Sequence, residues 1–280
     1  MTRRTAADQH SNGAHAGGGD PGPAGSGARP AVAIERRGPA LWARIDRPDR
    51  GNACGPDVID GLLAWLACGT ADDGVRVLVL TGSGRAFCAG ADMRAGAELL
   101  DDTDALLAYL DRGRALVDAV ASAAKPVIAA VNGAAFAGGF ELVLAADLAI
   151  AARSARLGDG HARHGIVPGW GSSARLPRIA GPRAAAELLL SGGAISAEEA
   201  CRLGIVNAVA DDGGLDAAVD ALVARLSVPD AATTRRILAL TRAARDGDDT
   251  LAAALQRERA TLAEHVSAPE FAATVARFLG

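Results

Sequence analysis

The sequence predicts an α/β protein with a mainly parallel sheet, followed by a helical C-terminal region. Short apolar runs at 75–80, 126–131 and 147–152 are bounded by polar or glycine-containing segments, a pattern typical of strands buried on both faces. Helical patterns separate these runs, and strand and helix in alternation imply right-handed crossovers between parallel strands. From Ser172 onward, helical patterns dominate.

Composition excludes several classes of protein. The chain has 280 residues, enough for a sizeable core, and its net charge of -4 gives no basic surplus for nucleic acid or an anionic membrane. No apolar run approaches the ~20 residues that span a bilayer, and the N-terminus lacks the apolar core of a signal peptide. The four cysteines include no C-x-x-C pair, so we expect no metal site. A soluble cytoplasmic protein is expected.

The N-terminal part begins with residues 1–30, which are rich in glycine, alanine and polar side chains. Such a segment buries too little apolar surface to offset its ordering entropy, so we expect a disordered tail. Residues 31–36 and 40–45 form a predicted hairpin around Gly38 and Pro39. A polar loop at 47–54 then leads to a helix over 56–67, whose apolar residues recur at helical spacing.

The central part repeats the order strand, loop, helix. The strand at 75–80 is followed by a glycine-rich loop and a helix over 103–122; the strand at 126–131 is followed by a helix that begins near Gly138; the third strand is 147–152.

The C-terminal part is expected to be helical at 172–179, 182–191, 196–203, 214–226, 231–244, 250–266 and 270–279. We therefore divide the chain into a tail at 1–30, an α/β core at 31–195 and a helical region at 196–280. A helical region appended to an α/β core suggests packing on another surface, such as another subunit.

One stretch, V-N-G-A-A-F-A-G-G-F-E-L at 131–142, combines features of an active site. Gly138 and Gly139 lie at a strand-to-helix turn, where backbone N–H groups can approach a ligand near the positive end of the helix dipole. Glu141 follows among apolar residues, where desolvation suits a carboxylate to proton transfer. A helix start with a capping acid is the alternative interpretation.

A second loop, at 85–93, leaves a predicted strand at the same edge of the sheet, the edge at which α/β proteins bind ligands. Together the two loops offer convergent N–H donors from Ala91 and Gly138, as an acyl oxyanion or enolate requires. Two unrelated glycine turns would be the alternative, but their shared position weighs against it.

The chain resembles the crotonase superfamily, the enoyl-CoA hydratase/isomerase family. The resemblance rests on four ordered motifs: R-P-x-x-x-N-A at 47–53, A-F-C-A-G-A-D-M at 86–93, K-P-V-I-A-A-V-N-G-A-A-F-A-G-G-F-E-L at 125–142, and G-I-V-P-G at 165–169. It extends over about 31–280, and several motifs in order are far more specific than any single glycine pattern.

The resemblance implies a spiral of ββα units, with a helical C-terminal region that builds trimers, often paired into hexamers. It also implies an acyl-CoA thioester as substrate, with coenzyme A as part of that substrate and no separate cofactor. The thioester oxygen would lie between the N–H groups of Ala91 and Gly138. The expected substrate-binding and CoA-binding residues are Ala53, Ala89, Ala91, Asp92, Met93, Arg94 and Gly138, with Arg50 and Arg94 as a basic rim.

Hydratases of this family use two glutamates to deliver water across the 2,3-double bond. Glu141 falls on the first, but His161 stands where the second is expected, flanked by Asp159 and His164. A histidine can act as acid or base near neutral pH, since its reference pKa is ~6.5.

We therefore expect an enoyl-CoA hydratase, a hydro-lyase of acyl-CoA or fatty acid metabolism, with catalytic residues Glu141, His161, Ala91 and Gly138. Double-bond isomerisation by a single acid/base, or another reaction of the superfamily, is the alternative. A non-catalytic acyl-CoA-binding scaffold is an alternative of another class. A dinucleotide fold is disfavoured because Phe87 occupies the third glycine position of that fingerprint, and no hydrolase triad is visible.

Overall fold

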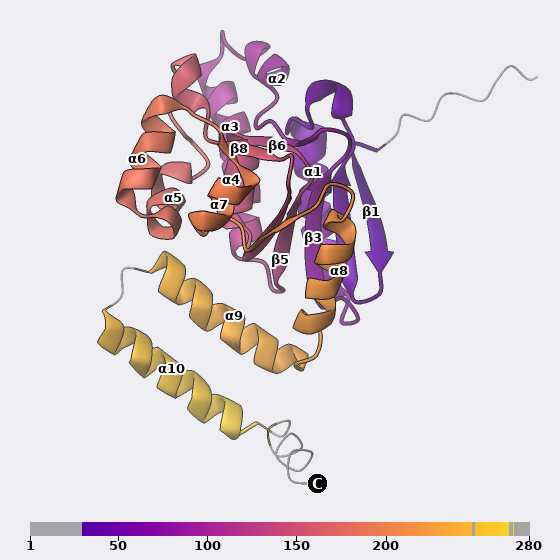
Figure 1. Cartoon of the computed structure of the whole chain (residues 1–280), viewed down its shortest axis with the longest axis vertical. Helices are drawn as coiled ribbons and strands as arrows, with labels where there is room; N and C mark the ends of the chain where they lie inside the picture. Colours follow the sequence, from indigo (N-terminus) through magenta and orange to yellow (C-terminus); the bar gives the residue numbers. More distant parts are fainter. Residues whose placement is uncertain (1–29, 248–249, 269–270, 272–280) are drawn as a thin grey trace, which may run out of the picture.

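The computed structural model describes residues 30–247, 250–268 and 271. The expected tail at 1–30 and the expected last helix at 270–279 therefore lie outside the described residues, apart from Pro30 and Phe271. Figure 1 shows an α/β core with two long helices at the C-terminal side.

The main sheet has six strands in the order β1-β2-β3-β5-β7-β10. Only β1 and β2 are antiparallel, as the predicted hairpin requires; every other pair is parallel. The strands are β1 Val32–Arg37, β2 Ala40–Ile45, β3 Val77–Gly82, β5 Val127–Val131, β7 Leu148–Ala152 and β10 Ala208–Ala210. This confirms the predicted parallel-sheet core.

A second, four-stranded sheet has the order β4-β6-β8-β9. Its strands are β4 Ala86–Cys88, β6 Ala134–Phe136, β8 Arg156–Gly158 and β9 Ile195–Ser196. The strands β4, β6 and β8 each follow a strand of the main sheet, so the chain passes through one strand of each sheet in turn. Runs this short carry no measurable periodicity, which explains why the individual strands were not predicted.

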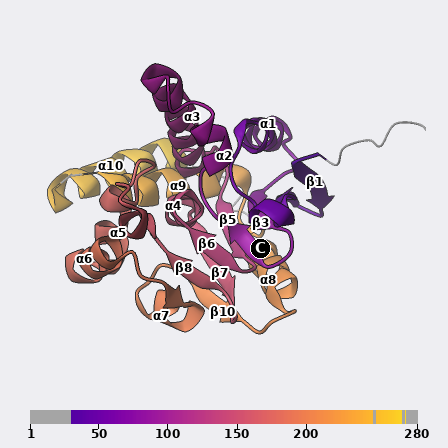
Figure 2. The ribbon, with the colours of Figure 1, turned by 90° about the horizontal axis from the view of Figure 1, so that it is seen from above.

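Helices cover both faces of the main sheet (Figures 1 and 2). They are α1 Pro56–Ala71, α2 Met93–Ala97, α3 Thr103–Ala121, α4 Gly138–Ala145, α5 Ser172–Ala180, α6 Pro182–Ser191, α7 Ala197–Arg202, α8 Leu215–Leu226, α9 Ala231–Asp246 and α10 Leu251–Val266, with 3-10 turns η1 Pro48–Arg50 and η2 His161–His164. Strand β3 shows the arrangement: Leu78 and Leu80 pack in one core with α1, α3 and α4, while Val77 and Val79 pack in the other with α8.

Three of the differences from the predicted elements have a clear structural basis. Strand β3 ends at Gly82 rather than at Leu80, because the hydroxyl of Thr81 donates to the Ala130 carbonyl (2.8 Å) and so fits inside the sheet. Helix α1 continues to Ala71, since Gly69 allows close contact with Leu78. The expectation of helices alone after the core is wrong at β10, which pairs with β7.

Helices α9 and α10 form a hairpin in which no residue is buried (Figure 1). Within the described ranges, no helix is both long and apolar enough to cross a membrane.

Candidate active site

The two loops meet, as the sequence predicts, but they leave β4 and β6 of the second sheet rather than the predicted strands at 75–80 and 126–131. Strand β4 pairs with β6, and the loops that follow them carry Ala91 and Gly138. A side-chain carbon at Gly90 would lie only 2.8 Å from the Gly138 nitrogen, so the loops contact each other closely. Glycine at position 90, with a φ of 100°, permits this approach.

Neighbouring contacts hold both N–H donors in place. Ala91 forms a parallel bridge with Cys54, and the Tyr109 hydroxyl tightens it by accepting from Asp92 N (2.9 Å) and donating to Cys54 O (2.7 Å). Before Gly138, Ala137 has a φ of 48°, a strained conformation for a non-glycine residue. Its N–H donates to Asp159 O (2.9 Å), which holds the turn that begins α4.

Neither the Ala91 N–H nor the Gly138 N–H donates a hydrogen bond to any acceptor within the described part of the chain. Backbone N–H groups in a partly buried position normally find a partner. Two adjacent unpaired donors, one of them at a helix N-terminus, are suited to bind an oxygen that carries negative charge.

Glu141 lies in the first turn of α4 with 1% of its surface exposed. Its Oε1 accepts two backbone hydrogen bonds, from Trp170 N (2.9 Å) and Ser172 N (3.0 Å). No hydrogen bond to Oε2 is present among the described residues, so Oε2 has no protein donor there. Burial raises the pKa of Glu141, and the two N–H donors and His161 offset part of that rise.

His161 lies in η2, with Nδ1 3.0 Å from Oδ1 of Asp159 and 14% of its side chain exposed. The two atoms are in ion-pair range but are not aligned as a straight hydrogen bond. Burial of the imidazole opposes its protonation, but the carboxylates of Asp159 and Glu141 outweigh burial and raise the pKa of His161.

Asp159 is fully buried, and both of its carboxylate oxygens are occupied. Oδ1 faces His161, and Oδ2 accepts a hydrogen bond from the Ser172 hydroxyl. Burial favours the neutral acid, but His161 and Ser172 outweigh it and lower the pKa of Asp159. Asp159 is therefore a charged internal group with no oxygen left for substrate.

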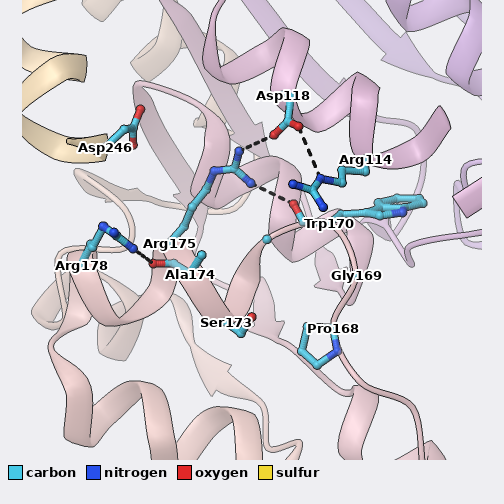
Figure 3. A pocket seen from close by; sticks show the side chains of 11 residues that line it. Arg114, Asp118, Pro168, Gly169, Trp170, Ser173, Ala174, Arg175, Arg178 and Asp246 are labelled. Carbon is cyan, nitrogen blue, oxygen red and sulfur yellow. Dashed lines mark hydrogen bonds and ion pairs between the residues drawn. The ribbon is translucent and has the colours of Figure 1, made fainter. Parts of the chain in front are cut away.

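The segment that contacts Glu141 through the backbone of Trp170 and Ser172 is held by packing and by an arginine. The indole of Trp170 lies between α3 and α4, where side-chain carbons at Gly113 and Gly138 would come within 2.0 and 2.1 Å of the ring. Arg175 holds the segment by donating to Trp170 O (2.8 Å) and pairing with Asp118 (Figure 3). A cavity of about 490 Å³ adjoins Trp170 and Arg175, but neither Glu141, His161, Ala91 nor Gly138 lines it.

The expected coenzyme A loops also come together. Ala89 N donates to Gly51 O (3.0 Å), which joins the loop of Ala53 to that of Ala89. Asp92 is buried; it caps α2 through Arg94 N and lies 3.5 Å from Arg50 Nη1. Met93 and Arg94 are exposed at the start of α2, beside these loops.

Comparisons with known proteins agree with this geometry. A sequence model of the family described as enoyl-CoA hydratase/isomerase matches residues 40–279. The chain belongs to the enoyl-CoA hydratase/isomerase (crotonase) family. The predicted family membership is confirmed, as is the crotonase fold with two sheets and C-terminal helices.

Relatives of this crotonase include a probable enoyl-CoA hydratase of Bacillus subtilis, 40% identical over 161 residues that cover 58% of this chain and 62% of the relative. A carnitinyl-CoA dehydratase of Salmonella enteritidis is 41% identical over 184 residues, covering 63% of this chain and 66% of the relative. The match thus spans just under two thirds of these relatives. The crystal structure of an enoyl-CoA hydratase from Bacillus anthracis superposes with a TM-score of 0.84 at 28% identity, covering 89% of this chain and 95% of that one.

Most of the predicted site residues lie together in this crotonase, whereas His164 does not. His164 is exposed, and Asp159 faces inward rather than toward a substrate. Phe140, next to the second glycine of the turn that begins α4, is fully buried in the core. Sequence reasoning missed Ser172, which it assigned only to a helix start; no sequence signal indicates that this serine contacts both Glu141 and Asp159.

Proposed function

We propose that this crotonase adds water across the double bond of a 2-enoyl-CoA thioester. The observation that carries the proposal is the buried carboxylate of Glu141, which is linked through Ser172 and Asp159 to the imidazole of His161. Two acid/base groups that interact with each other suit a reaction that removes one proton and delivers another. The names of its relatives, hydratases and dehydratases, agree with it.

The thioester oxygen binds to the N–H groups of Ala91 and Gly138, which stabilise the enolate that forms during addition. As the water oxygen bonds to the β-carbon, its proton passes to Glu141 Oε2. The imidazolium of His161 delivers a proton to the α-carbon, and the electron pair of the enolate forms the new C–H bond. Glu141 then loses its proton and His161 regains one by exchange with solvent.

For the substrate, we propose that Ala53 and Ala89 border the adenine of coenzyme A, while Arg50 and Arg94 supply a basic rim for its phosphates. Asp92 acts indirectly, because its carboxylate caps α2 and pairs with Arg50. Met93 and Ala91 then flank the thioester itself.

The test measures the rate at which the absorbance of the enoyl thioester is lost when the enzyme acts on short 2-enoyl-CoA substrates. Glu141→Gln and His161→Ala should each lower kcat/KM by about 10²–10⁴-fold, the usual contribution of a general acid or base. Glu187→Gln, an exposed glutamate on α6, is the matched control and should retain wild-type activity.

Full hydratase activity in both variants would contradict the assignment. Conversion of a 3-enoyl-CoA without hydration would instead identify an isomerase. Tight coenzyme A binding without turnover of any chain length would identify a scaffold.

For assembly, we propose that a second copy of this chain covers part of the C-terminal hairpin, in a trimer or a pair of trimers. Leu251, Leu255, Leu262 and Val266 of α10 are between 44% and 75% exposed. Their spacing of 4, 7 and 4 residues places them on one helix face. An uncovered apolar stripe of this length is typical of a subunit contact.

A further inference from the structure

Glu141, Ser172, Asp159 and His161 form one continuous chain of contacts, although they come from three separate segments: α4, the start of α5 and the stretch 159–161. Ser172 contacts both carboxylates: its N–H donates to Glu141 Oε1 (3.0 Å), and its hydroxyl donates to Asp159 Oδ2. Asp159 Oδ1 lies 3.0 Å from His161 Nδ1 and also accepts from His161 N (3.3 Å). Ser172 and Asp159 are both fully buried, so neither meets substrate directly.

We propose that Asp159 and Ser172 are positioning residues that hold Glu141 and His161 as a matched acid/base pair. This inference rests on the proposed function. The two ring nitrogens of His161 then have different roles. Nδ1 keeps its proton and faces Asp159, and Nε2 exchanges a proton with the substrate. Ser172 binds Glu141 through its N–H and Asp159, the partner of His161, through its hydroxyl. This one buried serine therefore fixes the spacing of the two catalytic residues.

The electrostatics of the site favour this arrangement. A buried carboxylate beside Nδ1 fixes the tautomer of an imidazole and stabilises its charged form. The surroundings of His161 contain the carboxylates of Asp159 and Glu141, the exposed Arg163 and His164 of η2, and helix α6 with Arg183 and Glu187. Of these, the carboxylates of Asp159 and Glu141 raise the pKa of His161.

The experiment measures the His161 pKa by NMR of the imidazole nitrogens, with kcat and KM as functions of pH. In Asp159→Asn the charge that favours the imidazolium is gone, so the His161 pKa should fall toward or below ~6.5. The alkaline limb of the rate profile should move to lower pH with it. We expect kcat to fall about 10²–10⁴-fold with KM nearly unchanged, and Asp159→Glu to restore part of it.

Ser172→Ala gives a second variant that removes only the hydroxyl and keeps the N–H bond to Glu141. It should lower kcat roughly 10-fold, as expected for one lost hydrogen bond to a carboxylate. Ser173→Ala, at the exposed neighbouring serine, is the matched control and should behave as wild type.

An unchanged His161 pKa in folded Asp159→Asn, or wild-type kcat in Ser172→Ala, would overturn the inference. Absence of enoyl-CoA turnover in the wild type would instead refute the proposed function, and the NMR titration, which needs no turnover, would still decide whether Asp159 holds His161.

Discussion

Two glycines determine where the Trp170 ring can lie. Gly113 on α3 and Gly138 on α4 leave a slot that the indole fills, with its Nε1 donating to Leu110 O (2.9 Å). Gly138 is also one of the two proposed oxyanion donors, so the packing of the ring and the position of that N–H are coupled. Small shifts of the indole should therefore change activity as well as stability.

Gly113→Ala should destabilise the protein although alanine favours helices. The new carbon would lie 2.0 Å from the indole, and forced overpacking costs about 1–3 kcal/mol. The control is Gly96→Ala in α2, where the nearest atom is 3.8 Å away. Without that clash, Gly96→Ala should be neutral or stabilising by about 0.5–1 kcal/mol. Urea unfolding measures the free energy of unfolding of both variants. Equal stabilities would contradict the close packing of the indole against Gly113.

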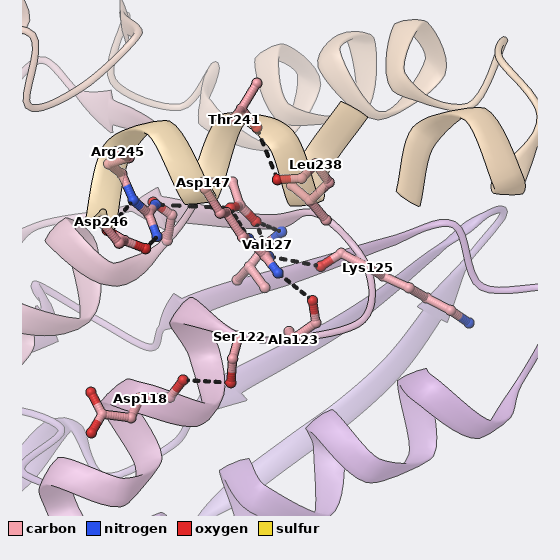
Figure 4. A network of polar contacts seen from close by, with 12 residues as sticks. Asp118, Ser122, Ala123, Lys125, Val127, Asp147, Leu238, Thr241, Arg245 and Asp246 are labelled. Atoms are coloured by element: carbon pink, nitrogen blue, oxygen red, sulfur yellow. Dashed lines mark hydrogen bonds and ion pairs between the residues drawn. The ribbon is translucent and has the colours of Figure 1, made fainter. Parts of the chain in front are cut away.

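At the scale of elements, helix α9 attaches to the core mainly through charged side chains. None of its residues is fully buried, yet Arg242 donates to Asp147 Oδ1 (2.7 Å) and Oδ2 (2.6 Å). Asp147 also accepts from Val127 N, at the start of β5 (Figure 4). Arg242 donates to Ala123 O as well. One arginine therefore links α9 to the segments that enter β5 and β7.

Arg242→Met should cost up to about 3 kcal/mol of unfolding free energy, because it removes the closest cation of the nearly buried Asp147 carboxylate and leaves only Arg245, 3.9 Å away. Arg153→Met removes the exposed pairs with Glu198 and Asp211 and should cost only about 0–1 kcal/mol. Urea unfolding at neutral pH compares the two. If Arg242→Met lowers the unfolding free energy no more than Arg153→Met does, the Arg242 contact does not stabilise the packing of α9.

At the scale of the whole molecule, the exposed apolar stripe on α10 gives the proposed assembly a direct test. Leu255→Glu places a charge within the stripe and should shift the assembled protein toward monomers, since burying an unpaired carboxylate is costly. Gln256→Glu puts the same charge on the neighbouring exposed position of α10 and should leave the assembly intact. Sedimentation velocity measures both, and an unchanged state in Leu255→Glu would contradict the proposed contact.

The sequence alone determined the parallel core, most helix positions and the meeting of the Ala91 and Gly138 loops. It could do so because hydrophobic periodicity and glycine turns are local signals, and because parallel strands bring their following loops to one edge. Glu141 could also be identified from the sequence, since it is a lone carboxylate among apolar residues at a predicted helix start.

Only the tertiary structure decided how that carboxylate is supported. The strands of the second sheet are too short for periodicity to indicate, and β10 follows a helix in a region with a helical pattern. Asp159 and His164 both flank His161 in the sequence, but in the structure Asp159 is buried against His161 and His164 is exposed. Ser172 joins Glu141 to Asp159 across separate segments, and contacts between residues distant in sequence arise only when the chain packs.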